Sequence, residues 1–174
     1  MCGICGYTKF NHSSEKNIDF MLEEIKHRGP DFFSKKIEKT ISLGHSRLSI
    51  IDLSQEANQP FISSDGRYSI VYNGEIYNYK NIRVKLEKDF KTKFRTSSDT
   101  EVILNGYIHL KNKIFKELDG MFALAIWDNQ LKKIILARDM FGEKPLFYFI
   151  FNNDIFFSSE IKSLSMAPMF NNKI

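Results

Sequence analysis

The chain begins with the stretch MCGICG, residues 1–6, and an apolar run from Ile4 to Phe10 continues from this start and predicts a β-strand. If Met1 is removed, Cys2 becomes the N-terminal residue and carries both a thiol and a free α-amine. The pKa of such an amine is about 7.7–8.0 and that of a thiol about 8.5, so the amine can serve as the base that activates the nucleophile. The start of the chain therefore predicts acyl transfer from an amide.

Cys2 and Cys5 also form a C-x-x-C pattern, which can mark a redox site or half of a zinc site. A zinc site needs two further ligands, and the four histidines are scattered without metal-ligand spacing. A redox C-x-x-C opens a helix after a strand, whereas this one lies in a predicted strand at the start of the chain. We therefore expect no metal site, and we expect Cys5 to pack in the core.

Length and composition indicate one globular domain. The chain has 174 residues, of which 43% are hydrophobic and 26% are charged, and its net charge of +4 is spread along the sequence. No basic cluster indicates nucleic-acid binding, because the densest one, residues 80–95, is diluted by acidic residues. No apolar run is long enough for a membrane span, and no secretory signal is seen. Two cysteines without a disulfide framework fit a reducing compartment, so we expect the cytoplasm.

Apolar spacing and turn residues predict the order of helices and strands. A first helix, capped by Ser13 or Ser14, buries positions within 18–25 and stops before Gly29 and Pro30. Two further helices are predicted at residues 82–90 and, behind a capping box at 98–101, at residues 100–110. Strands are predicted at residues 32–37, 41–48, 68–72, 121–127, 133–137, 146–151 and 155–158. Strands at both ends with helices between them predict an α+β fold with antiparallel sheets.

Three motifs could complete an active site, and each has a plainer interpretation. Asn73-Gly74 is a strong turn signal, but the Asn73 amide and the Gly74 backbone N–H could also form an oxyanion hole. Arg47, in an otherwise apolar strand, could reach solvent or could clamp a ligand carboxylate. Asp99 could favour a helix N-terminus or could pair with a substrate ammonium group. Taken together with Cys2, these groups would all be used by glutamine.

These motifs belong to a set of stretches through which the chain resembles a known family. It is similar to the glutaminase domain of glutamine-hydrolysing asparagine synthetase, a class II glutamine amidotransferase with an N-terminal nucleophile. The similar stretches follow the family's order and span nearly the whole chain: residues 2–6, 27–31, 44–52, 72–79, 94–101, 118–123, 137–146 and 158–162.

The resemblance implies a four-layer αββα sandwich, the N-terminal nucleophile hydrolase fold, with two antiparallel sheets between helices. It implies that Cys2 attacks L-glutamine and that the reaction passes through a glutamyl thioester. Asn73 and Gly74 would form the oxyanion hole, and Glu75 and Asp99 would hold the substrate's amino group. The α-carboxylate would be bound by Arg47 with the backbone of Leu48, Ser49, Ile50 and Ile51. The resemblance also suggests structural support from Arg28, Asp31, Arg138 and Asp139.

The chain departs from this family in one respect. Such synthetases continue into an ATP-using domain with a Ser-Gly-Gly-x-Asp-Ser phosphate loop, which does not occur in this sequence. We therefore expect residues 1–174 to be the glutaminase domain alone, without a C-terminal synthetase domain. ATP and Mg²⁺ would belong to that absent domain, so we expect no cofactor here. Apolar surface left exposed by its absence would favour self-association as a homo-oligomer.

Competing functions differ in what receives the ammonia. The expected one supplies it to an asparagine-synthetase domain or to a separate synthetase subunit. An alternative is the glutaminase half of another amidotransferase, which would modify a sugar or a peptide. A third is a non-catalytic regulatory relic of the fold. The third would predict loss of Cys2, Arg47 or Asn73, and all three are present.

Overall fold

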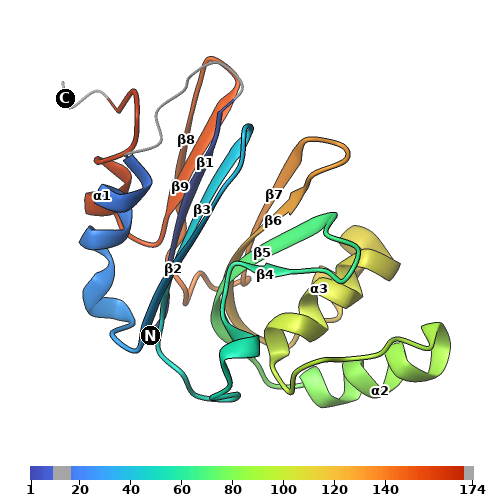
Figure 1. Ribbon diagram of the computed structural model, residues 1–174. Helices are drawn as coiled ribbons and strands as arrows, with labels where there is room; N and C mark the ends of the chain where they lie inside the picture. The colour runs from blue at the N-terminus through green and yellow to red at the C-terminus, as the bar shows by residue number, and fades with distance from the viewer. Residues whose placement is uncertain (10–16, 171–174) are drawn as a thin grey trace.

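Two antiparallel sheets lie face to face in the computed structural model, which describes residues 1–9 and 17–170 (Figure 1). Across the first sheet the strands are β2 (Phe32–Ile37), β3 (Ile41–Arg47), β1 (Gly3–Thr8), β9 (Asp154–Ser158) and β8 (Phe147–Phe151). Across the second they are β4 (Phe61–Ile62), β5 (Tyr68–Ile76), β6 (Gly120–Asp128) and β7 (Lys133–Arg138). Every pairing between these strands is antiparallel, as the sequence predicts.

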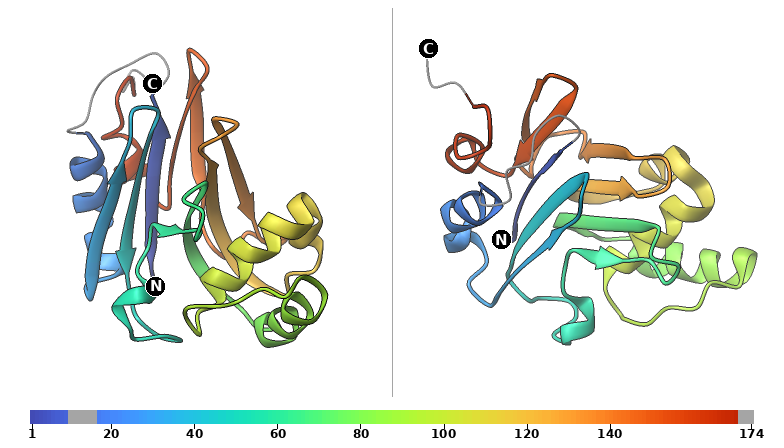
Figure 2. Two further views of the ribbon diagram at one scale, coloured as in Figure 1. Left: turned by 45° about the vertical axis from the view of Figure 1, so that its right-hand side comes forward. Right: turned by 45° about the horizontal axis from the view of Figure 1, so that its top comes forward.

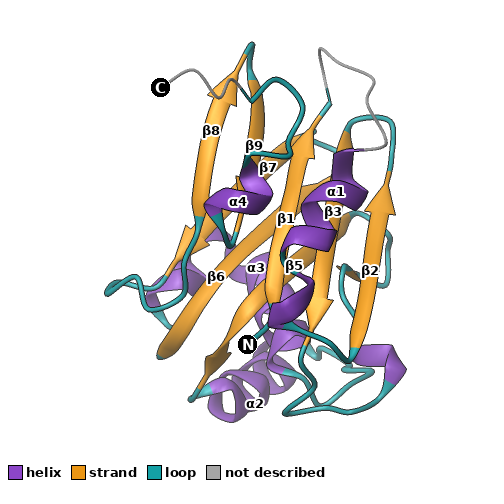
Figure 3. Cartoon of the chain, turned by 90° about the vertical axis from the view of Figure 1, so that its left-hand side faces the viewer, coloured by secondary structure: helices purple, strands orange, loops and turns teal. Residues whose placement is uncertain are grey.

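Helices cover the outer face of each sheet (Figures 2 and 3). The first sheet is covered by α1 (Asn17–Glu24) and α4 (Ile161–Leu164), and the second by α2 (Tyr79–Phe90) and α3 (Asp99–Leu110). Three short 3-10 helices complete the described elements: η1 (Lys26–Arg28), η2 (Gln55–Ala57) and η3 (Lys111–Lys116). The α+β class and the four-layer arrangement are thus confirmed. None of the described helices is long and apolar enough to cross a membrane.

An apolar layer between the two sheets joins them. Its fully buried residues are Ile4, Ile41, Leu43, Val71, Ala123, Ala125, Trp127 and Phe157. Two further apolar clusters complete the core, one between each sheet and the helices that cover it. The inner strands are therefore buried on both faces, which explains why their sequences are apolar runs rather than alternating patterns.

Strand alternation then decides which layer each side chain enters. In β1, Ile4 faces the layer between the sheets, whereas Cys5 and Tyr7 pack toward α1. In β5, Val71 faces the layer between the sheets, whereas Tyr72 packs toward α3. The expectation that Cys5 is a packed core residue is confirmed, since its side chain is fully buried.

Two local predictions about turns and caps are confirmed. Ser98 caps α3, and its Oγ accepts a hydrogen bond from the Glu101 backbone N–H at 3.3 Å. The Glu101 carboxylate does not return to Ser98 as in a standard capping box, because it accepts from the backbone N–H of Thr96 at 2.7 Å. The turn between β8 and β9 places Asn152 and Asn153 at positive φ, which asparagine tolerates well.

One local expectation is wrong. Asn73 and Gly74 do not form a turn but lie inside β5, where they pair with Ala123 and Phe122 of β6. Tertiary pairing prevails over the turn signal because β6 continues alongside β5 as far as Ile76. Glycine is required at this point, since a Cβ at Gly74 would lie 2.2 Å from the Met121 carbonyl oxygen. The predicted cap at Ser13 or Ser14, the Phe10 end of β1 and the last residues, 171–174, lie outside the described residues.

Leu43→Ala is expected to lower the free energy of unfolding by about 2–5 kcal/mol, because it opens a cavity in the layer between the sheets. Trp127 is the single tryptophan and is buried in that same layer, so its fluorescence follows unfolding in urea. Val84→Ala, at an exposed position of α2, is the matched control and should stay within about 0.5 kcal/mol. A loss in Leu43→Ala no larger than the control's would contradict a packed layer.

His45 should make stability depend on pH. It is fully buried in β3, its Nε2 lies 3.2 Å from the Tyr72 carbonyl oxygen, and burial lowers its pKa to about 3. Below about pH 6.5 the unfolded chain binds a proton that the folded chain does not. The free energy of unfolding therefore decreases by about 1.4 kcal/mol for each unit by which the pH is lowered. In His45→Gln the free energy of unfolding, measured in urea, should depend less steeply on pH between about pH 6 and pH 4. An unchanged slope would show that His45 is not the group responsible.

Candidate active site

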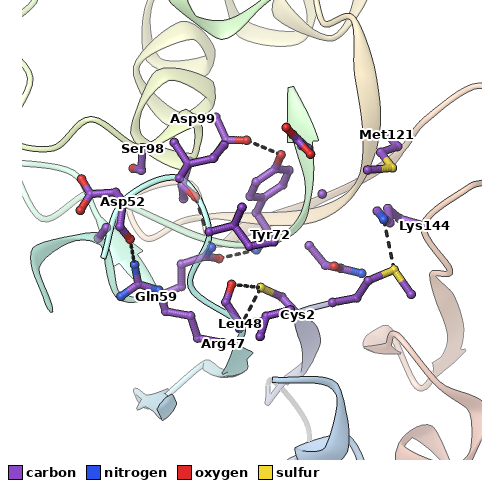
Figure 4. A pocket seen from close by; sticks show the side chains of 18 residues that line it. Cys2, Arg47, Leu48, Asp52, Gln59, Tyr72, Ser98, Asp99, Met121 and Lys144 are labelled. Atoms are coloured by element: carbon purple, nitrogen blue, oxygen red, sulfur yellow. Dashed lines mark hydrogen bonds between the residues drawn. The ribbon is translucent and has the colours of Figure 1, made fainter. Parts of the chain in front are cut away.

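A pocket of about 170 Å³ brings the predicted site residues together (Figure 4). It lies where the N-terminus, the end of β3, the middle of β5 and the start of α3 meet. Its lining includes the predicted residues Cys2, Arg47, Leu48, Ile50, Ile51, Asn73, Gly74, Glu75 and Asp99. Ser49 does not line the pocket, because its backbone N–H donates to Asp31 Oδ2 at 2.8 Å on the outer side of the loop.

The Cys2 thiol is held at the floor of this pocket. Its Sγ lies 3.4 Å from the backbone nitrogen and 3.5 Å from the carbonyl oxygen of Leu48. The backbone of Cys2 is held as well, because Arg28 Nε donates to its carbonyl oxygen at 3.0 Å. Arg28 is in turn paired with Glu160 at 2.8 Å. Arg28 thus gives the structural support that the resemblance suggests.

Burial raises the pKa of the Cys2 thiol, although the Leu48 N–H, the N-terminal charge and Arg47 act in the opposite direction. The thiol is therefore protonated at neutral pH and needs a base before it can act as a nucleophile. While Met1 is present, the Cys2 nitrogen is an amide and cannot be that base. Met1 also lines the pocket, and its Sδ accepts a hydrogen bond from Lys144 Nζ at 3.2 Å.

Arg47 anchors the loop of residues 48–58 that covers one side of the pocket. One Nη1 N–H donates to the Ser54 carbonyl oxygen at 2.9 Å and another to Asn58 Oδ1 at 2.5 Å, and Nη2 donates to the Asp52 carbonyl oxygen. A guanidinium has five N–H groups. Two of them are therefore left without a partner among the described residues, enough for one bidentate contact with a carboxylate.

Asp52 fastens the same loop to the segment before α3. Its Oδ2 accepts from the Ser97 backbone N–H at 2.9 Å and from the Ser97 hydroxyl at 3.0 Å. Burial would raise the pKa of this carboxyl, but hydrogen bonds from Ser54 and Ser97 outweigh it and lower the pKa to about 2. Asp52 is therefore ionised at neutral pH and keeps the loop close to Asp99.

The side-chain amide of Asn73 is a buried hydrogen-bond donor that lines the pocket. The residue is 2% exposed, and its Nδ2 has no partner among the described residues. A buried donor left unsatisfied costs about 1–3 kcal/mol, so such a group calls for an explanation. Because Asn73 lines the pocket beside Cys2, a ligand oxygen in the pocket would satisfy it.

The backbone N–H of Gly74 lies on an open edge of β5. The N–H groups of Tyr72 and Ile76 point away from β6, to Gln59 Oε1 at 2.6 Å and to Asp99 Oδ2 at 3.2 Å. Because N–H groups two residues apart leave a strand on the same side, the Gly74 N–H points the same way. The neighbouring strand β4 pairs only with Ser69 and Ile70, so this edge is unpaired at Gly74.

Two carboxylates, Asp99 and Glu75, also line the pocket. Asp99 is 4% exposed, and its Oδ2 accepts from the Tyr72 hydroxyl at 2.7 Å. Burial raises the pKa of Asp99, while the Tyr72 hydroxyl and the Ile76 N–H act to lower it. This arrangement suits a ligand that carries an ammonium group near Asp99 and a carboxylate near Arg47.

The sequence analysis missed part of the pocket lining. Figure 4 shows Met121 and Lys144 on the opposite side of Cys2 from Arg47 and Asp99. Other residues missed are Ala57, Gln59, Tyr72, Ser98 and Thr100. Tyr72 adjoins the Asn73-Gly74 motif, but nothing in the sequence shows that its hydroxyl meets Asp99.

Lys144 is placed by the connection between β7 and β8. Asp139 accepts hydrogen bonds there from the backbone N–H groups of Glu143 at 2.9 Å and Lys144 at 3.1 Å. Gly142 has φ +68° and packs against the Arg138 guanidinium. Asp139 therefore supports the segment that carries Lys144, as the resemblance suggests. Among the residues described, no three His, Cys, Asp or Glu side chains are grouped so that they could hold a metal ion.

Comparison with known proteins gives consistent results in sequence and in fold. The family model described as "Glutamine amidotransferase domain" matches residues 1–174. Asparagine synthetase [glutamine-hydrolyzing] 1 of Bacillus subtilis is 42% identical over 174 residues, covering 96% of this chain and 27% of the relative. Asparagine synthetase [glutamine-hydrolyzing] 2 of the same organism is 38% identical over 173 residues, covering 97% and 23%. The chain thus spans about a quarter of the length of these relatives.

A solved structure shares the fold. Glutamine phosphoribosylpyrophosphate amidotransferase from B. subtilis superposes with a TM-score of 0.78 at 21% identity, covering 95% of this chain and 43% of that one. At this level of identity the similarity concerns the fold alone. It agrees with the two face-to-face antiparallel sheets described above.

Cys2 should be the cysteine that reacts with iodoacetamide. Its side chain is partly exposed to the pocket, whereas Cys5 is fully buried and burial strongly raises the pKa of its thiol. We expect one adduct by intact mass, mapped to Cys2, formed faster as the pH rises above neutral because the thiolate is the reactive form. Cys2→Ser should form none. An adduct on Cys5 in the folded protein would contradict this assignment. The same spectrum shows whether Met1 has been removed.

Proposed function

This chain belongs to the family of glutamine amidotransferase domains, and from that premise we propose that it hydrolyses L-glutamine to glutamate and ammonia through a glutamyl thioester on Cys2. The observation that carries the proposal is the buried, unsatisfied Nδ2 of Asn73 in the pocket that holds the Cys2 thiol. A donor kept in place without a partner fits a charge that exists only during the reaction.

Activation of the nucleophile depends on removal of Met1. The α-amine of Cys2 then takes the proton of its own thiol, directly or through a water molecule, and supplies the base that the raised thiol pKa demands. Arg28 holds the Cys2 carbonyl oxygen, so the amine and the thiol remain oriented toward the pocket. Loss of Met1 also opens the part of the pocket that its side chain lines.

Two steps then complete the hydrolysis. Sγ attacks the side-chain amide carbon of glutamine, and the carbonyl oxygen becomes an oxyanion that accepts from Asn73 Nδ2 and the Gly74 N–H. As the carbon–nitrogen bond breaks, the protonated amine of Cys2 gives its proton to the departing nitrogen, which leaves as ammonia. Water then adds to the thioester carbon, the sulfur–carbon bond breaks, and glutamate and the free thiol result.

The rest of the pocket fits the amino-acid end of glutamine. The two free N–H groups of Arg47 would bind the α-carboxylate, with the backbone of residues 48–51 alongside. Asp99 and Glu75, which also line the pocket, would hold the α-ammonium group. Because Met121 and Lys144 lie beyond Cys2 on the other side, the ammonia would be released toward them.

We infer the use of the ammonia from the relatives, whose names describe glutamine-hydrolysing asparagine synthetases. The ammonia would pass to an ATP-dependent synthetase module, joined to this domain or carried by a separate subunit, and would serve asparagine biosynthesis. ATP and Mg²⁺ would act in that module, and the glutaminase reaction proposed here needs neither. Two free thiols support a cytoplasmic location.

Asn73→Ala should lower kcat for glutamine hydrolysis by about 10²–10³-fold with a much smaller change in KM, because an oxyanion donor acts mainly in the transition state. Glutamate formation by protein without Met1 is the measurement. Cys2→Ala should abolish turnover, and Asn129→Ala, in the remote turn after β6, is the matched control. Retained turnover in Cys2→Ala would refute the thioester route. A purely KM effect of Asn73→Ala would remove Asn73 from the oxyanion hole.

A further inference from the structure

The Tyr72 hydroxyl occupies one of the two oxygens of Asp99. It donates to Oδ2 at 2.7 Å (Figure 4). The Ile76 backbone N–H reaches the same oxygen at 3.2 Å. The backbone N–H groups of Thr100 and of Asp99 itself also act on this carboxylate, and Asp99 lines the pocket. The protein's own donors therefore fix the orientation of the carboxylate at the pocket.

The direction of the Tyr72 hydroxyl is fixed by the surrounding structure. Tyr72 is 3% exposed and packs in the apolar cluster under α3. Its backbone N–H donates to Gln59 Oε1 at 2.6 Å, and Gln59 Nε2 donates to Thr100 Oγ1, in the first turn of α3, at 3.2 Å. Gln59 therefore ties β5 to the helix turn that carries Asp99, and the phenol meets the carboxylate without being free to rotate away.

The electrostatic setting gives this hydrogen bond a second effect. The Tyr72 hydroxyl contacts Asp99 directly. The other charged or titratable groups that line the same pocket are Cys2, Arg47, Asp52, Glu75 and Lys144. Burial raises the pKa of Asp99, and the Tyr72 hydroxyl is the first of the groups that oppose this rise. Burial also raises the pKa of Tyr72 well above its ordinary value, so the phenol remains a donor at every pH at which Asp99 titrates.

We propose that Tyr72 is a positioning residue for recognition of the substrate's amino group. Its hydroxyl, which donates to Oδ2, holds Asp99 in the ionised form and directs the carboxylate toward the α-ammonium group of glutamine. Tyr72 itself would touch neither the substrate nor the reacting atoms, and it would act through Asp99. This inference rests on the function proposed above.

The test compares L-glutamine with glutarate monoamide, which is glutamine without its α-amino group. Both present the same amide to Cys2, but only glutamine needs Asp99. Protein without Met1 is assayed for ammonia release over about pH 5–9. In the wild type, kcat/KM should favour glutamine, and this preference should disappear at low pH as Asp99 becomes protonated.

Tyr72→Phe should lower the preference for glutamine about tenfold, since a hydrogen bond to a charged group is worth on the order of tenfold in an equilibrium constant. Most of the loss should appear in KM for glutamine. The acid limb of kcat/KM for glutamine should move up by about one pH unit, because Asp99 without its donor protonates more easily. Tyr77→Phe is the matched control, since Tyr77 is 57% exposed and does not line the pocket, and it should leave both substrates and the pH profile unchanged.

A structural role for Tyr72 predicts a different result. Equal loss for both substrates, with an unshifted acid limb, would overturn the proposal. The double variant Asp99→Asn/Tyr72→Phe removes the Asp99 charge together with the Tyr72 hydroxyl. It is a control for misfolding of Tyr72→Phe. Its preference should equal that of Asp99→Asn alone, and a further fall would also overturn the proposal. If the wild type releases no ammonia from glutamine, the proposed function fails instead, which is a distinct outcome.

Discussion

The site depends on one geometric constraint, namely that the inner strands of both sheets are buried on both faces. A residue in β1, β3 or β5 must therefore point either between the sheets or toward the helices, and the choice alternates along the chain. Ile4 and Val71 lie in the layer between the sheets, and the same alternation turns Tyr72 toward α3. The pocket is lined by residues from both faces of β5, Tyr72 toward α3 and Asn73 on the face of Val71.

The open edge of β5 is the second element on which the chemistry depends. The pairing of β4 ends at Ile70, so the N–H groups beyond it must find other partners. Two of them are bound by side chains, Gln59 and Asp99, and the one between them, at Gly74, faces the pocket. Within residues 1–9 and 17–170, the short edge strand thus leaves the Gly74 N–H unpaired beside the equally unpaired Asn73 amide.

The pocket holds charges of both signs, the Arg47 guanidinium and the Asp99 carboxylate. Arg47 donates to the oxygens of its loop and keeps two N–H groups for a ligand, whereas Asp99 accepts from Tyr72 and Ile76 and lines the pocket. Each buried charge is partly satisfied by the protein and partly left for a substrate, which lowers the cost of burial without neutralising the site. An amino acid that carries a carboxylate and an ammonium group fits this division, and the family to which the chain belongs agrees with it.

Local sequence alone determined the α+β class, most strand and helix positions and the cap at Ser98, because these depend on neighbouring residues. It also predicted Cys2 as the nucleophile. It also indicated Arg47, Asn73 and Asp99 as one set. Only the tertiary structure decided that Asn73-Gly74 continues a strand, since β6 pairs with it from some fifty residues away. Likewise, only the structure brought Tyr72, Gln59 and Lys144 to the pocket. Their roles depend on which face of a strand is turned inward and on contacts between distant segments, and neither is visible in the local pattern of residues.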